Sequence, residues 1–313
     1  SSSSAASDVY KRQIIYNFLS EIVYHKSKMC AIVVLKGGIR QMIKLIATDM
    51  DGTFLDNKKQ FDKSFIDLFF EMKEQGVLFV AASGNQYARL YQKFLPMSED
   101  MYFIADGGSY IAKGPNTLEV FDMNRKKAFL AIERVKEHYP DFKIVVAGEK
   151  YAYARKKNHL TKELTTYYCS NKLIDDFDEI DEPITKIAIL DPSGDIKNNA
   201  GDITSILPSG LQIITSGNEW MDIQRDGVNK GLGMRYIQEH EHISRDECLA
   251  FGDQMNDYAL LKSVKYGFAM ENAVDEIKKL AYGITDSNED QGCLKIIKKA
   301  LRKNKEQAAN DLL

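Results

Sequence analysis

The sequence predicts an α/β fold, a parallel sheet with helices on both faces, interrupted by a smaller α+β domain. Two observations predict this class. Short apolar runs alternate with amphipathic segments near both ends of the 313-residue chain, which is the pattern of βαβ units. Between these regions, from residue 124 to residue 222, the pattern changes to a hairpin, further strands and separate helical stretches. We therefore expect one core domain built from two separate parts of the chain.

The first part of the core is predicted over residues 42–123. A mostly apolar strand ends at Asp49, and "DKSFIDLFFEMKEQG" then repeats large apolar residues at helical spacing until Gly76. The apolar run "VLFVAASGN" predicts a buried parallel strand, and "QYARLYQKFL" predicts the next helix. "MYFIADGGSYI" indicates another strand followed by a glycine turn.

The inserted α+β domain is predicted over residues 124–222. "NRKKAFLAIERVKEHYP" has the pattern of an amphipathic helix, and "FKIVVAGEKYAYARK" that of a hairpin. "TKIAILD" and "GLQIITSGNEWMDIQ" indicate further strands, so we expect three or four strands with two helices. Trp220, near the end of this region, is assigned to the hinge or to core packing.

The second part of the core is predicted over residues 223–303. Helical segments here alternate with the apolar strands "ECLAFGD" and "YGFAM", and a basic helix follows. We expect residues 304–313 to form a frayed tail, since the last residues of a domain are often poorly ordered.

Residues 1–41 do not have the sequence pattern of either domain. "SSSSAASDVYKRQ" is low in complexity, and its second half resembles the translation of a transposon-end sequencing adapter. Lys36-Gly37-Gly38 is compatible with a ribosome-binding sequence shortly before Met42. We expect residues 1–41 to be a non-native or disordered extension; a genuine helical or disordered segment is the alternative.

Composition excludes several classes of protein. The net charge of −3 does not suggest a nucleic-acid binder, and no apolar run approaches the ~20 residues of a membrane span. The four cysteines form no C-x-x-C pair, which favours reduced thiols in a cytoplasmic protein. We expect a monomer or weak homodimer with no nucleic-acid or membrane partner.

Two carboxylates follow the first strand at once, in "KLIATDMDGT". Asp49 and Asp51 stand at i and i+2, so both can face one site at the carboxyl end of the sheet, where α/β proteins bind ligands. An acidic turn that caps the next element is the alternative, whereas the spacing of a calcium-binding loop is absent. Two neighbouring carboxylates repel each other, so a cation or a reacting group is expected beside them.

Other polar residues stand at corresponding points of the fold. Ser83 and Gly84 close the second strand, and Lys230 begins a helix. Asp253 and Asp257 follow the strand "ECLAFGD". Each has an ordinary alternative: a small-residue turn, a surface lysine and a helix cap, respectively. Together they supply acids for Mg²⁺ and donors for phosphate oxygens, a set suited to phosphoryl transfer. The candidate metal ligands are Asp49, Asp51, Asp253 and Asp257.

Four segments, "DMDGT", "ASG", "NKG" and "GDQMND", resemble in order the motifs of the haloacid dehalogenase (HAD) superfamily. The resemblance covers residues 42–300 and is closest to the Cof-type phosphatases, which have a Rossmann-like core and an α/β cap of the C2 type. The interval between the first two motifs is too short for a helical cap, and the interval between the second and third holds residues 124–222. The inserted domain would therefore be the cap.

This resemblance implies a role for each matching residue. Asp49 would be the nucleophile that forms an aspartyl-phosphate, and Asp51 the general acid and then the base. Mg²⁺ would be bound by Asp49, the backbone carbonyl of Asp51, and Asp253, while Asp257 would orient Lys230 or the metal's waters. The residues that would hold the phosphate are Ser83, Gly84, Lys230 and Asn256.

The chain departs from the family pattern at two places. Asn85 stands where many relatives have arginine, and Asp106-Gly107-Gly108 replaces the usual Asn-Gly-Ala. The predicted function is a Mg²⁺-dependent phosphatase of small phosphorylated metabolites such as sugar phosphates. A phosphomutase or phosphotransferase on the same fold is one alternative, and a non-catalytic sensor of a phosphorylated ligand is another.

Overall fold

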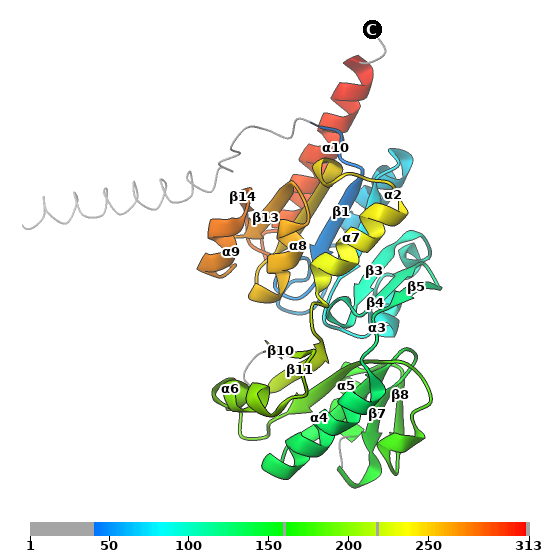
Figure 1. The fold of residues 1–313 in the computed structure, drawn as a ribbon. Helices are drawn as coiled ribbons and strands as arrows, with labels where there is room; N and C mark the ends of the chain where they lie inside the picture. Colours follow the sequence, from blue (N-terminus) through cyan, green and yellow to red (C-terminus); the bar gives the residue numbers. More distant parts are fainter. Residues whose placement is uncertain (1–40, 159–160, 217–218, 311–313) are drawn as a thin grey trace, which may run out of the picture.

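The computed structural model describes residues 41–158, 161–216 and 219–310 of the chain. Two bodies, each built around its own sheet, are joined by two crossings of the chain (Figure 1). This arrangement confirms the predicted α/β core with an inserted α+β domain. The extension expected over residues 1–41 lies outside the described residues except at its last position.

The core contains an eight-stranded sheet that both parts of the chain build. Its central strand, β1, pairs with β2 from the first part of the core and with β12 from the second, both in parallel. The strands in their order across the sheet are β14 (Gly283–Thr285), β13 (Tyr266–Met270), β12 (Cys248–Gly252), β1 (Leu45–Asp49), β2 (Leu78–Ala82), β3 (Tyr102–Ala105), β4 (Tyr110–Lys113) and β5 (Asn116–Val120).

The core sheet is parallel from β14 to β3 but antiparallel at its other edge. β3, β4 and β5 form a meander of antiparallel pairs. The sequence predicted a parallel sheet, and at this position only a strand and a glycine turn. The antiparallel edge was therefore not predicted. An antiparallel edge on an otherwise parallel sheet is common, because tight turns can join antiparallel neighbours directly.

Helices cover both faces of the core sheet (Figure 1). On one face α2 (Ser64–Glu74) packs against α10 (Gly292–Asn310), and on the other α7 (Lys230–His240) packs against α8 (Tyr258–Lys262). α3 (Tyr87–Lys93) follows β2, and the short α9 (Asp275–Leu280) precedes β14. Large apolar side chains of both helix layers join one core with the central strands.

The frayed tail predicted from residue 304 is wrong as far as residue 310, because α10 continues to Asn310. Asn304 is buried, and its side chain forms hydrogen bonds of 2.8 Å with both the N–H and the carbonyl of Ile43. This polar side chain therefore ties the second half of the last helix to the segment that leads into β1.

The inserted domain is larger than predicted. Its sheet has six strands rather than three or four, in the order β10 (Leu211–Ser216), β11 (Trp220–Arg225), β9 (Ile184–Leu190), β6 (Lys143–Gly148), β7 (Ala152–Arg155) and β8 (Asn171–Ile174). The predicted hairpin is present as β6 and β7. The helices in the described part of the domain are α4 (Arg125–His138), α5 (Thr161–Tyr167) and α6 (Ile196–Ile206). Because β11 ends at Arg225, this sheet extends beyond the boundary expected at residue 222.

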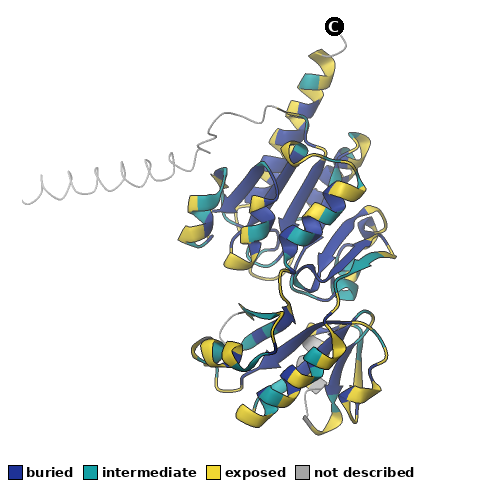
Figure 2. Ribbon diagram, viewed as in Figure 1, coloured by how far each residue is buried: buried dark blue, intermediate teal, exposed yellow. Residues whose placement is uncertain are grey.

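Alternation along β9 separates the two faces of the inserted sheet. Ile187 and Ile189 pack with the apolar face of α4, while Ala188 belongs to a smaller cluster on the opposite face. Figure 2 shows that the central strands of both sheets are buried while the outer surfaces of the helices are exposed. Lys186 shares its side of β9 with Ala188, so a buried lysine lies on the face away from α4.

No helix in the described ranges is both long enough and apolar enough to cross a membrane. The three cysteines within those ranges, Cys169, Cys248 and Cys293, carry free thiols.

We predict that the close contact between α7 and α8 tolerates no side chain at Gly231. A Cβ atom there would lie 2.3 Å from the carbonyl oxygen of Ala259, so Gly231→Ala should lower the free energy of unfolding by about 1–3 kcal/mol. Gly201→Ala is the matched control, because a methyl group added at this position in helix α6 would have nothing within 4 Å. The control should raise stability by about 0.5–1 kcal/mol through helix propensity. Urea unfolding measures both, and an unchanged Gly231→Ala midpoint would contradict this packing.

Candidate active site

Three neighbouring strands of the core bring their carboxyl ends to one edge of the sheet. Asp49 is the last residue of β1, Asp253 follows the end of β12, and Ser83 follows the end of β2. Because β12, β1 and β2 pair in parallel, these three residues meet although they are far apart in sequence. Motifs from both parts of the chain therefore lie at this edge of the sheet.

Three buried acids form a compact group at this edge. One carboxylate oxygen from each of Asp49, Asp253 and Asp257 lies within 4.8 Å of the other two. The hydroxyl of Thr53 donates a hydrogen bond of 2.8 Å to Asp253 Oδ1. Gly52 passes close to the same acid at a φ of +82°, and a Cβ there would lie 2.5 Å from Asp253 Oδ2. The glycine of "DMDGT" is therefore needed for the turn to approach the acids.

Lys230 lies between two of these acids and is almost fully buried. Its ammonium group is 2.5 Å from Asp49 Oδ1 and 2.6 Å from Asp257 Oδ1. Burial alone would lower the pKa of Lys230, but the charges of Asp257 and Asp49 outweigh that effect and raise it. The lysine that begins α7 is therefore a charged bridge, not the surface lysine that its sequence context also allowed.

Asp257 is held by the backbone as well as by Lys230. Its Oδ2 accepts hydrogen bonds from the N–H groups of Asp253, at 3.0 Å, and Gln254, at 3.1 Å. The second acid of "GDQMND" thus fixes the turn that carries the first and also positions Lys230.

Negative charge exceeds positive charge in this group. Burial raises the pKa of Asp49 well above its ordinary value, and the nearby Asp257 raises it further, against the opposing effect of Lys230. Burial also raises the pKa of Asp253, while its hydrogen bond from Thr53 acts in the other direction. Three acids share a single lysine, so a hard divalent cation with a preference for oxygen ligands fits the site.

Asp51 differs from the other acids because its carboxylate is not part of the three-acid group. Its side chain is 42% exposed, and Lys59 lies 2.8 Å from its Oδ1. Asn85 donates a hydrogen bond of 3.0 Å to its Oδ2. The Asp51 carboxylate therefore lies apart from the three-acid group and lines the adjacent cavity.

A cavity of about 390 Å³ lies between the core and the inserted domain. The predicted site residues that line it are Asp49, Asp51, Ser83, Gly84 and Asn256, while Lys230, Asp253 and Asp257 are not among its lining residues. The inserted domain contributes Tyr167, Tyr168, Lys186, Trp220 and Asp222. Trp220 thus has a cavity-lining position in addition to the packing expected for it, and its ring contacts that of Tyr167 edge to face.

Hydrogen bonds between the two domains surround this cavity. Lys186 donates to the carbonyl of Gly84 at 2.8 Å and forms an ion pair with Asp222 at 3.0 Å. Gln86 and Ser170 exchange two hydrogen bonds, of 2.8 and 3.1 Å. The inserted domain is therefore fixed directly against the turn that carries Ser83 and Gly84.

Sequence reasoning missed four cations that line the cavity, namely Lys59, Arg89, Lys93 and Lys186. Two signals could have found some of them. Arg89 and Lys93 are four residues apart in the helix after the second motif, so they share one face. Lys186 interrupts an otherwise apolar strand, which is unusual for a residue with no partner. Lys59 lies in a turn where no comparable signal is present in the sequence.

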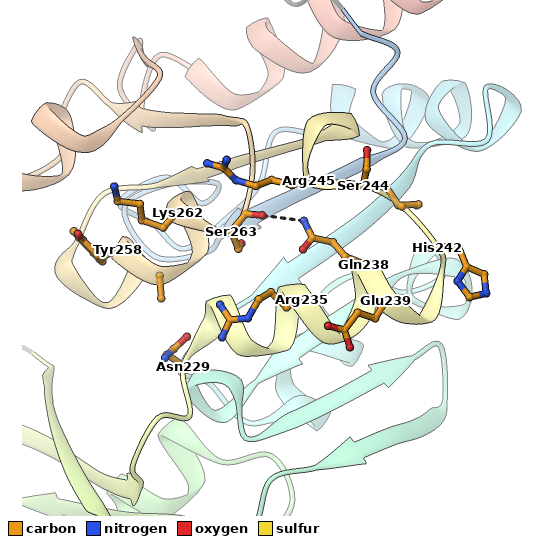
Figure 3. A pocket seen from close by; sticks show the side chains of 12 residues that line it. Asn229, Arg235, Gln238, Glu239, His242, Ser244, Arg245, Tyr258, Lys262 and Ser263 are labelled. Carbon is orange, nitrogen blue, oxygen red and sulfur yellow. Dashed lines mark hydrogen bonds between the residues drawn. The ribbon is translucent and has the colours of Figure 1, made fainter.

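A second hollow, of about 870 Å³, lies along α7 and α8 on the core (Figure 3). Gln238 donates a hydrogen bond of 3.0 Å to the Ser263 carbonyl across it. Its lining includes Arg235, Glu239 and Lys262 but none of the eight predicted site residues. Size therefore does not identify the site, whereas the convergence of acids does.

Comparison with known proteins assigns the chain to a family. The model of the haloacid dehalogenase-like hydrolases matches residues 46–297. The chain belongs to the haloacid dehalogenase-like hydrolases. The resemblance of its four motifs is thereby confirmed, as is the expectation that the protein is an enzyme of the hydrolase class.

Relatives of this hydrolase include phosphatases of small metabolites. It is 31% identical to the 5-amino-6-(5-phospho-D-ribitylamino)uracil phosphatase YbjI of Escherichia coli, over 83% of this chain and 97% of the relative. It is 24% identical to the pyridoxal phosphate phosphatase YbhA of Escherichia coli, over 78% and 94%. The crystal structure of SMU.1108c from Streptococcus mutans superposes with a TM-score of 0.76 at 30% identity, over 83% of this chain and 99% of that one.

We predict that Asp106 gives this hydrolase a pH-dependent stability. Burial raises the pKa of Asp106 from 3.8 to about 6, against the opposing charge of Lys186. The folded state therefore binds the proton more tightly than the unfolded state, and stability falls as pH rises from about 4 to 6. Asp106→Asn, which restores the residue usual in Cof-type phosphatases, removes this effect. At pH 8 its free energy of unfolding, measured by urea denaturation, should exceed that of the parent by about 1–3 kcal/mol.

The gain from Asp106→Asn should shrink at pH 4, because there the folded state keeps Asp106 protonated and the parent recovers most of the lost stability. Asp175→Asn is the control, because Asp175 is 76% exposed on the inserted domain. A gain that is equal at both pH values would show that the charge of Asp106 is not responsible.

Proposed function

We propose that this hydrolase is a Mg²⁺-dependent phosphatase that removes phosphate from small phosphorylated metabolites through an aspartyl-phosphate at Asp49. The observation that carries the proposal is the buried bridge of Lys230 between Asp49 and Asp257, with Asp49 exposed to the cavity on its other side. A carboxylate held in this way is oriented before substrate arrives, which favours nucleophilic catalysis.

Asp49 and Asp253 are the acids that would hold the Mg²⁺, together with the backbone carbonyl of Asp51. Asp257 would orient Lys230 or the metal's waters. When bound, the cation would offset the charge of the acids and of the phosphoryl oxygens. The proximity of three buried carboxylates and the single lysine among them support this assignment. Asp51 would contribute its backbone carbonyl, as the family resemblance implies, because its carboxylate lies outside the three-acid group.

The first half of the reaction would join Asp49 to the phosphorus atom. Lys230 occupies Oδ1 of Asp49, which leaves Oδ2 to attack phosphorus. As the bond from Oδ2 to phosphorus forms, the bond from phosphorus to the ester oxygen breaks, and Asp51 would give that oxygen a proton. The organic product leaves as an alcohol and the phosphoryl group stays on Asp49.

The second half would return the enzyme to its starting state. Asp51, now ionised, would take a proton from water while the water oxygen attacks phosphorus. The bond between phosphorus and Asp49 breaks, and inorganic phosphate leaves. Ser83, the backbone at Gly84, Lys230 and Asn256 would hold the phosphoryl oxygens in both halves. All four can donate hydrogen bonds; Ser83, Gly84 and Asn256 line the cavity with Asp49, and Lys230 contacts Asp49 directly.

The cavity supports substrates of modest size. Its volume of about 390 Å³ is near the lower end of the range usual for small-molecule sites. We propose phosphomonoesters of sugar size, including sugar phosphates, and the phosphorylated ribitylaminouracil and pyridoxal phosphate named for the relatives are substrates to test. We further propose that the enzyme works in the cytoplasm, as a monomer or weak homodimer, without a nucleic-acid or membrane partner.

Substitution of the two acids of "DMDGT" should give different kinds of loss. Asp49→Asn removes the nucleophile, so no phosphoenzyme should form. Asp51→Asn keeps the nucleophile but lacks the base for hydrolysis, so aspartyl-phosphate should form with a good leaving group and then accumulate. Mass spectrometry of the intact protein after an acid quench should detect a gain of about 80 Da in the second variant only, the mass of one phosphoryl group.

The nucleophile assignment has a clear contrary outcome. If Asp49→Asn still hydrolyses p-nitrophenyl phosphate while neither variant shows the adduct, direct attack by water becomes the better account.

Loss of one acid should weaken the binding of Mg²⁺. Asp253→Asn replaces a charged ligand with a neutral one, so titration calorimetry should show at least a tenfold increase in Kd for Mg²⁺. Asp246→Asn is the control, because Asp246 is an exposed acid paired with Lys265 outside the site. Equal Mg²⁺ affinity in the two variants would place the cation elsewhere.

A further inference from the structure

Four cations line the cavity, and Lys186 and Lys59 are paired with acids. Lys186 is paired with Asp222 and donates to the Gly84 carbonyl. Lys59 is paired with Asp51. Their positive charges are therefore largely offset within the protein, and neither is available in full for a negatively charged ligand.

Lys93 has a different environment. Its ammonium group donates a hydrogen bond of 2.7 Å to the carbonyl oxygen of Lys59, which is a neutral acceptor. Within the described ranges, no acidic side chain lies at ion-pair distance from it. An ammonium group has three donors, so this half-buried lysine keeps donors for a ligand in the cavity.

Arg89 adds a second positive charge on the same helix face. Arg89 and Lys93 stand at i and i+4 of α3, and both line the cavity. Burial lowers the pKa of Lys93 and the charge of Arg89 lowers it further, while the charges of Asp51 and Asp56 act in the other direction. Like charges at this spacing destabilise a helix, whereas an anion between them would relieve the repulsion.

Lys93 and Arg89 lie near the residue that is proposed to protonate the leaving group of the substrate. Lys59 contacts Asp51 through its ammonium group and Lys93 through its carbonyl, so a single residue separates Lys93 from Asp51. Asp51 is the residue proposed to protonate the leaving group. A group bound by Lys93 and Arg89 would thus belong to the organic part of the substrate and not to the phosphate under attack.

We propose that Lys93, which lines the cavity beside Arg89, binds an anionic oxygen group, a carboxylate or a second phosphate, on the leaving group of the substrate. The inference rests on the proposed phosphatase function and narrows its substrate class. An alternative role for Lys93 is to hold the turn at Lys59, which has a left-handed φ of 60°, through the hydrogen bond to its carbonyl. In that case Lys93 would affect all substrates equally.

Two compounds that differ in one charged group separate these roles. 6-Phosphogluconate carries a carboxylate at the position where glucitol 6-phosphate carries a neutral CH₂OH. Each is measured as a competitive inhibitor of p-nitrophenyl phosphate hydrolysis by the full chain with Mg²⁺. The unsubstituted enzyme should have a Ki at least tenfold lower for 6-phosphogluconate, and the ratio should fall as KCl is raised.

Lys93→Met keeps the length of the side chain but removes its charge. It should bring the ratio of the two Ki values below three and leave the Ki of glucitol 6-phosphate nearly unchanged. Lys93→Arg should retain most of the preference. Gln92→Met is the matched control, since Gln92 is exposed on the same helix and does not line the cavity.

Equal Ki values in the unsubstituted enzyme would overturn the subsite. An equal rise of both Ki values in Lys93→Met would overturn it too, and would assign Lys93 to the support of the turn. If p-nitrophenyl phosphate is not hydrolysed at all by the unsubstituted enzyme, the proposed phosphatase function itself fails.

Discussion

The buried ammonium group of Lys230 is the contact on which the rest of the site depends. It joins the end of β1 to the turn after β12 by bridging Asp49 and Asp257. An unpaired lysine in this position would be very costly, and so would two unpaired acids. The lysine comes from the start of α7, so α7, β1 and the turn after β12 must keep their relative positions for the charges to remain matched.

Several features of the fold serve this one requirement. The parallel pairing of β12, β1 and β2 puts three strand ends at one edge, and Gly231 lets α7 approach α8 closely enough for Lys230 to reach the acids. The inserted domain then closes the edge, with Lys186 bonded to the Gly84 carbonyl. Charge therefore differs among three places around the site: Lys186 is paired with Asp222 beside the inserted domain, negative charge is in excess at the three acids, and two cations of α3 line the cavity.

Much of this arrangement could be predicted from sequence because it depends on short-range patterns. Apolar runs that end in Asp49, Ser83 and Asp253 identify strand ends, and the carboxyl ends of parallel strands meet at one edge. The antiparallel edge at β4 and β5 was missed because "DGGSYI" was interpreted only as a turn after a strand. It is the turn and second strand of a hairpin. The helix beyond residue 304 was missed because its stability depends on the contact between Asn304 and Ile43, which are distant in sequence. Lys59 and Lys186 were missed for the same reason, since their partners are visible only after folding.

The central claim is that Asp49 receives the phosphoryl group while Mg²⁺ lies between Asp49 and Asp253. A crystal structure of the protein with Mg²⁺ and beryllium fluoride, a mimic of the phosphoryl group on aspartate, tests it most directly. The account predicts beryllium bonded to Asp49 Oδ2, fluorine atoms facing Ser83, Lys230 and Asn256, and Mg²⁺ in contact with Asp49 and Asp253. Beryllium on another residue, or Mg²⁺ bound away from these two acids, would contradict it.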